Sequence, residues 1–109
     1  MSQEFVRRRD VRNSVQMAAR CQTKNGVRGE GWLSDISATG CCVETRNIYV
    51  DLGMRMLIRP QGMEGLTGVV RWIEGQRFGL EFDAPLYGPV VEHLVAAHGE
   101  RQSLEVSSR

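Results

Sequence analysis

The sequence contains few of the residues on which disulfide-rich domains, metal sites and membrane spans depend. Among its 109 residues are only three cysteines, and no two of them form a CxxC pair. An odd count, with no histidine at metal-ligand spacing, argues against a disulfide framework and against a zinc site. No apolar run approaches the roughly 20 residues that cross a bilayer, and the first residues lack the apolar core of a secretory signal. We therefore expect a cytoplasmic protein with reduced thiols that is not membrane-embedded.

Aromatic residues and net charge are also scarce. Aromatics make up 6% of the chain, and the formal net charge is +1. Binding of single-stranded nucleic acid by a small barrel normally needs exposed aromatics along a basic groove, so no direct DNA or RNA binding is expected. The sequence offers no nucleophile with a base, no paired acids and no metal-ligand set. It therefore predicts a protein that is not an enzyme and has no cofactor.

Positive charge is nevertheless concentrated near the start of the chain. Half of the 14 basic residues, but only three acidic residues, lie within the first thirty positions. This asymmetry suggests an anionic partner at the N-terminal end. On charge alone, a solvated basic leader explains the pattern equally well.

Six short segments have the composition of β-strands. The segment from Val15 to Cys21 alternates apolar with polar or small residues, and Phe78, Leu80 and Phe82 share one face of the last segment. The expected strands cover residues 15–21, 28–34, 41–45, 54–58, 66–74 and 77–83. Short strands separated by turn residues predict an all-β barrel or sandwich.

The residues after the last strand follow a different pattern. Pro89 stands where a first helical turn tolerates proline, and Gly99 stands where a helix often stops. We expect a short amphipathic helix that packs on the β-structure. The expected organisation is a flexible basic arm (1–13), the β-domain with its C-terminal helix (14–98) and a disordered tail (99–109).

The first candidate binding motif is the arginine cluster RRRDVR. Arg8 and Arg12 are four residues apart, and Arg9 lies beside Arg8. Guanidinium groups bind phosphate oxygens and the O6/N7 edge of guanine through paired hydrogen bonds, and they stack on flat rings. An arm with several arginines can therefore close over a planar anion, although basic N-termini without any such role are common.

The second candidate motif is the stretch DISATG. Asp35, Ser37 and Gly40 occupy its first, third and sixth positions. If the chain is extended here, Asp35 and Ser37 point the same way. The carboxylate can then accept hydrogen bonds from a guanine edge beside the hydroxyl, and Gly40 permits positive φ and close approach. The alternative is a plain turn in which these side chains satisfy their own backbone.

Together the two motifs form a longer pattern that resembles the PilZ domain family, receptors for the bacterial second messenger cyclic di-GMP. The resemblance covers most of the chain, from about Arg7 to about His98. It includes the hairpin GVVRWIEGQRFGLEF, which looks like the family's late hairpin through Val70, Trp72, Gly79 and Phe82. The resemblance implies a six-stranded antiparallel β-barrel with a C-terminal helix.

The resemblance also implies roles for the motif residues. Arg8 and Arg12 would grip phosphates and guanine faces, and Arg9 would add a cation or a stacking plane. Asp35 and Ser37 would read a guanine edge, and Gly40 would let the loop approach it. Trp72 would either flank the ligand or serve as a half-buried cover of the sheet.

The leading functional hypothesis is a single-domain cyclic di-GMP receptor or adaptor. In this hypothesis the ligand orders the N-terminal arm, and the signal passes to a separate downstream effector protein. The alternative is a PilZ-like protein-interaction adaptor that acts without ligand. The intact Arg8, Arg12, Asp35, Ser37 and Gly40 argue against that alternative.

Overall fold

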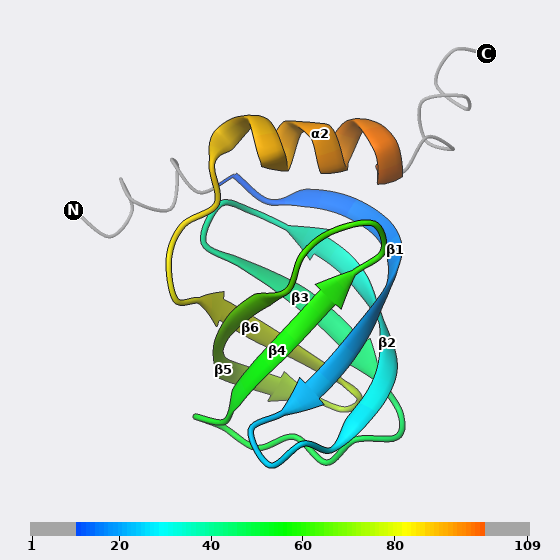
Figure 1. Cartoon of the computed structure of the whole chain (residues 1–109), viewed down its shortest axis with the longest axis vertical. Coiled ribbons are helices and arrows are strands. Elements are labelled where there is room, and N and C mark those ends of the chain that lie inside the picture. The colour runs from blue at the N-terminus through cyan, green and yellow to red at the C-terminus, as the bar shows by residue number, and fades with distance from the viewer. Residues whose placement is uncertain (1–10, 100–109) are drawn as a thin grey trace.

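The computed structural model describes residues 11–99, which form a closed barrel of six antiparallel strands with a helix at one end (Figure 1). The elements are β1 (Asn13–Thr23), β2 (Arg28–Ile36), β3 (Gly40–Thr45), β4 (Arg55–Pro60), β5 (Leu66–Glu74), β6 (Arg77–Phe82) and α2 (Gly88–His98). Around the barrel the strand order is β1-β2-β3-β6-β5-β4. The predicted six-stranded barrel with a C-terminal helix is therefore confirmed. No helix in the described part of the chain is long and apolar enough to cross a membrane.

The barrel closes through β1, which pairs with a strand on each side. It pairs with β2 from Asn13 to Gln22, with an irregularity between Ser14 and Met17, and its second half, from Ala19 to Thr23, also pairs with β4. Because β1 is 11 residues long, it is long enough to serve both neighbours. Both pairings are antiparallel, so the backbone hydrogen bonds of β1 are satisfied on both edges where the strands overlap.

The core is built from alternate residues of the strands, as the period of two requires. In β1, Val15, Met17 and Cys21 point inward and are at most 1% exposed. In β6, Phe78 and Leu80 are equally buried, at 1% and 2% exposed, on the face that the sequence predicted. The alternation in the sequence therefore identified the inner face of the barrel correctly.

Several strand bounds differ from the sequence-based expectation. β1 begins two residues earlier than Val15, β2 continues to Ile36, and β4 runs to Pro60 instead of ending before it. Pro60 is the last residue of its strand, where the absence of an N–H costs little. The amide of the next residue, Gln61, donates to the carbonyl of Ala18 (2.9 Å), so the contact with β1 continues past the proline.

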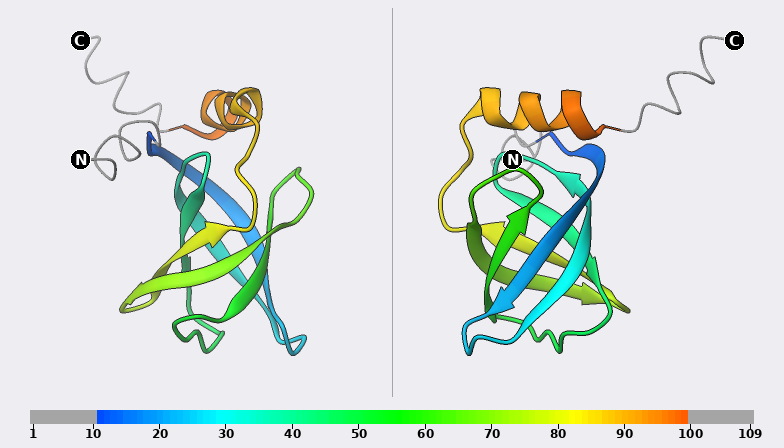
Figure 2. Two further views of the ribbon diagram at one scale, coloured as in Figure 1. Left: turned by 90° about the vertical axis from the view of Figure 1, so that its left-hand side faces the viewer. Right: turned by 45° about the vertical axis from the view of Figure 1, so that its right-hand side comes forward.

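Helix α2 covers one end of the barrel (Figures 1 and 2). Leu94 belongs to the barrel core and Val91 is also buried, so the apolar side of the helix faces the strands. Pro89 lies in the first turn, and the amide of Gly99 donates to the carbonyl of Val95 (2.8 Å), as the expected helix ends require. Gly99 also pairs with Val15, so it belongs to the folded unit and not to a tail. The expected arm up to residue 10, and the expected tail from residue 100, lie outside the described residues.

Two of the cysteines lie in the core. Cys21 and Cys41 are each 1% exposed. Burial raises the pKa of Cys21 from the ordinary value of 9.0 to about 11, and it raises the pKa of Cys41 further. Thiolates, not thiols, are nucleophilic, so neither side chain is activated for chemistry.

The pKa of Cys21 gives a prediction for stability at alkaline pH. Below pH 9 both the folded and the unfolded chain keep the thiol proton, and above it the unfolded chain loses the proton first. The free energy of unfolding is therefore expected to fall by about 2 kcal/mol between pH 9 and pH 11 from this thiol. Urea unfolding across this range measures the fall. Cys21→Ala should make the fall shallower without removing it, because the raised pKa of Cys41 adds a fall of its own. Equal slopes in the two proteins would contradict the assignment.

Candidate functional site

The two sequence motifs meet on the outer face of the barrel. Nη1 of Arg12 lies 2.9 Å from Oδ1 of Asp35, although the two residues are 23 positions apart in the chain. Their side chains are 51% and 29% exposed, so the ion pair is accessible from solvent. Arg8 and Arg9 lie outside the described residues, and the structure does not place them.

Strand register explains why these side chains meet. Asn13 pairs with Ile36, and Ser14 pairs with Asp35, so the chain entering β1 runs beside the end of β2. Arg12 directly precedes β1 and reaches across to the neighbouring strand. The contact therefore follows from the pairing of β1 with β2.

Ser37 does not share the orientation of Asp35. Strand β2 ends at Ile36, and Ser37 is 0% exposed. Its hydroxyl accepts from the amides of Thr39 (3.3 Å) and Gly40 (3.2 Å) and donates to the carbonyl of Gly40 (3.3 Å). The expectation that Asp35 and Ser37 point the same way is wrong, because the extended strand stops between them. Ser37 shapes the loop between β2 and β3 by bonding to its backbone.

Gly40 is required for a reason other than the expected one. Its φ is not positive; the glycines with positive φ in the described part of the chain are Gly26, Gly53, Gly62 and Gly75. A Cβ at Gly40 would instead overlap the carbonyl oxygen of Leu80 on β6. Gly40 therefore permits close approach of two strands, and the expected left-handed conformation is absent.

Trp72 lies on the same outward row as Asp35 but far along it. The cross-strand partners run from Asp35 to Cys42, then to Gly79, then to Trp72. Four strands about 4.8 Å apart separate the ends of this row by about 14 Å. The indole covers Gly79 so closely that a Cβ there would overlap its ring nitrogen. Trp72 is thus a half-buried cover of the outer sheet, and a ligand contact at this residue stays a prediction.

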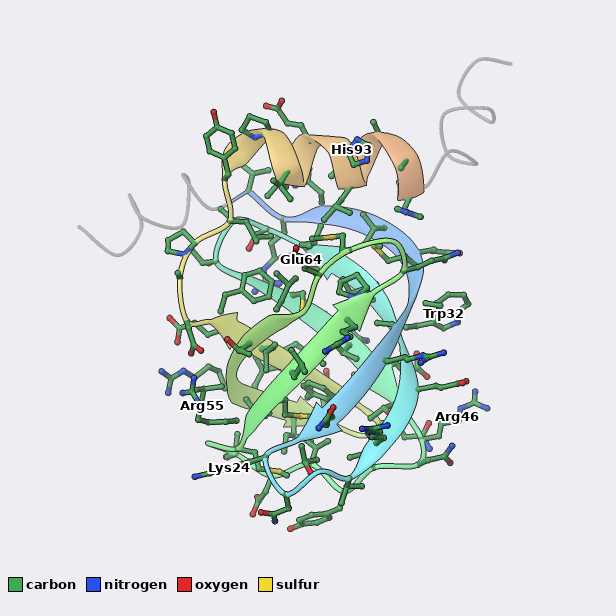
Figure 3. All side chains as sticks on the ribbon, in the orientation of Figure 1. Lys24, Trp32, Arg46, Arg55, Glu64 and His93 are labelled. Carbon is green, nitrogen blue, oxygen red and sulfur yellow. The ribbon has the colours of Figure 1, made fainter. Side chains whose placement is uncertain are left out.

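The structure adds Trp32, which the sequence analysis did not single out. Trp32 is 55% exposed and points away from the barrel (Figure 3). In a regular strand residues 32 and 35 would face opposite sides, but a bulge between Leu33 and Asp35 turns both Trp32 and Asp35 outward. Only the strand register shows that Trp32 and Asp35 lie on the same outer face, because no signal in the sequence marks the bulge between them.

The remaining charged side chains of this face do not form a metal site. Within residues 11–99 no group of three His, Cys, Asp or Glu side chains could hold a metal ion. Cys42 is buried on the outer side of the sheet, where Nη2 of Arg77 donates to its sulfur (3.8 Å). This face carries the exposed ion pair between Arg12 and Asp35 and the exposed indole of Trp32.

Comparison with solved structures defines the class of this fold. The PilZ domain of CeSA from a cellulose-synthesizing bacterium has a TM-score of 0.58 at 16% identity, over 89% of this chain and 98% of that chain. The inhibitor of motility MotI/DgrA of Bacillus subtilis has a TM-score of 0.53 at 20% identity, over 81% of this chain and 47% of that chain. At these identities the similarity concerns the fold. This chain matches about half of MotI/DgrA.

The PilZ domain family model matches residues 6–97. The chain therefore belongs to the PilZ domain family, a family of cyclic di-GMP receptors and adaptors. A comparison with curated proteins gives no significant match. The family match includes the segment that carries Arg8, Arg9 and Arg12, and the loop that carries Asp35, Ser37 and Gly40.

Proposed function

We propose that this protein is a cyclic di-GMP receptor that signals to a separate effector protein. The observation that carries the proposal is the ion pair between Arg12 and Asp35, which joins the two halves of the motif on an exposed face. A guanidinium and a carboxylate held side by side match a ligand that presents both phosphates and guanine N–H groups.

In the proposed complex each side chain of the site has a distinct role. Arg12 binds a phosphate or the O6/N7 edge of a guanine, and Asp35 accepts hydrogen bonds from the N1–H and N2–H edge. Arg8 and Arg9 supply further guanidinium groups from the arm. Ser37 acts as a positioning residue, since its hydroxyl already holds the loop that follows Asp35.

To bind in this way, the ligand must break the ion pair between Arg12 and Asp35. An exposed pair of this kind contributes about 0–1 kcal/mol, so exchanging it for contacts with the ligand costs little. We propose that the ligand fixes residues 1–12, which precede β1, against the barrel. This changes the shape and the charge of the surface that a partner protein meets.

Calorimetric titration of the full chain with cyclic di-GMP tests the proposal, with GTP and cyclic di-AMP as controls. The expected result is saturable heat with cyclic di-GMP alone. Hydrogen exchange should also slow for residues 1–12 in the complex, because the ligand contacts the arm. A titration without heat and without slower exchange would favour the adaptor that acts without ligand.

A further inference from the structure

Trp32 stands beside Asp35 on the same face of the sheet. Their partners on β3 are Glu44 and Cys42, which are two residues apart, so Trp32 and Asp35 lie one pleat from each other. One pleat corresponds to about 7 Å along the strand. A flat base that lies over Trp32 would therefore bring its edge to the carboxylate of Asp35.

The surroundings of Trp32 leave its indole accessible. Its partner on β1 is Ala18, a small side chain, and both residues line a hollow of about 860 Å³ on the outer face of β1, β2 and β4. Trp72, in contrast, is half-buried against Gly79. Of the two tryptophans, Trp32 is the one with an open ring face.

Three arginines, Arg20, Arg46 and Arg59, line the same hollow beside the carboxylates of Glu30 and Glu44. Arg20 and Arg59 are cross-strand partners on β1 and β4, and both line the hollow. Neither forms an ion pair with another of the residues 11–99, whereas Arg12, Arg55 and Arg71 each do. A phosphate attached to a base on Trp32 would thus find guanidinium groups on the β1 side of the ring.

We propose that Trp32 is a base-stacking residue that binds the face of the guanine whose edge Asp35 reads. The inference rests on the proposed function and names a contact beyond the two family motifs. Bases stack on aromatic side chains whatever their identity, while Asp35 selects the guanine edge. Trp32 therefore contributes affinity, and Asp35 contributes specificity.

Calorimetry with cyclic di-GMP on Trp32→Ala, Trp32→Phe and Tyr49→Ala tests the inference. Trp32→Ala should weaken binding about tenfold, and Trp32→Phe should retain most of the affinity, because a phenyl ring still stacks. Tyr49 is the matched control: it is an aromatic that is 76% exposed, in the connection between β3 and β4, and its loss should leave affinity unchanged. Unchanged melting temperatures show that the variants fold.

A second readout follows the indole itself. In a Trp72→Phe variant that calorimetry shows to bind cyclic di-GMP, saturating ligand should quench the emission of Trp32. If wild type binds but Trp32→Ala binds equally well, or if the emission stays constant, the stacking role is wrong while the proposed function stands. An exposed tryptophan that serves a partner protein would give this same result. If wild type itself does not bind cyclic di-GMP, both proposals fail.

Discussion

Replacing Arg12 with alanine is expected to weaken cyclic di-GMP binding about 100-fold and to leave the melting temperature almost unchanged. A hydrogen bond to a charged group contributes about 1.5–3 kcal/mol, and each 1.4 kcal/mol is a tenfold change in affinity. The variant also leaves the carboxylate of Asp35 without its partner, where it repels the ligand phosphates. Stability should hardly change, because the ion pair is 51% and 29% exposed.

Asp35→Asn separates the two roles of the carboxylate. Asparagine keeps the shape but offers one acceptor oxygen, and its NH₂ group opposes the N–H donors of a guanine edge. Binding should therefore weaken, and the loss in the double variant with Arg12→Ala should be smaller than the sum of the single losses. Contacting residues that share a ligand normally show such coupling.

Arg55→Ala is the matched control for Arg12→Ala. Arg55 is 52% exposed and forms an ion pair with Asp83, but it lies on β4, which does not carry the motif. Its loss removes the same charge and the same kind of contact away from the candidate site. If Arg12→Ala and Asp35→Asn bound cyclic di-GMP as tightly as Arg55→Ala, the site would be assigned wrongly.

The barrel could be predicted from the sequence because its physical cause is local. In β1 and β6 the apolar residues recur at every second position, and this period alone identifies the buried face. Strand ends were less predictable, because they depend on pairing with distant segments. Pro60, for example, extends β4 because β1 lies opposite it.

The candidate site could be predicted only in part. Resemblance to the family brought Arg12 and Asp35 together, and the structure places them in contact. The predicted orientation of the Ser37 side chain is wrong, because β2 ends at the turn that the Ser37 hydroxyl stabilises. The placement of Trp32 beside Asp35 depends on a bulge between Leu33 and Asp35. The extra residue shifts the alternation of inward and outward side chains by one position, so that both side chains face outward.

Gly40→Ala gives the second large effect, and this effect is on stability. An added Cβ would overlap the carbonyl oxygen of Leu80, which is backbone and cannot rotate away. Strands β3 and β6 must then separate where Gly40 pairs with Glu81. The free energy of unfolding is expected to fall by about 3 kcal/mol, measured by urea unfolding.

Gly88→Ala is the control that isolates this cause. Gly88 begins α2, and a Cβ there would meet no heavy atom within 4 Å, so the change should be neutral or slightly stabilising. If Gly40→Ala were as stable as Gly88→Ala and yet bound cyclic di-GMP more weakly, the glycine would serve the ligand directly. A loss of stability with ligand affinity retained by the folded fraction would instead mean that Gly40 shapes the site only through the packing of β3 on β6.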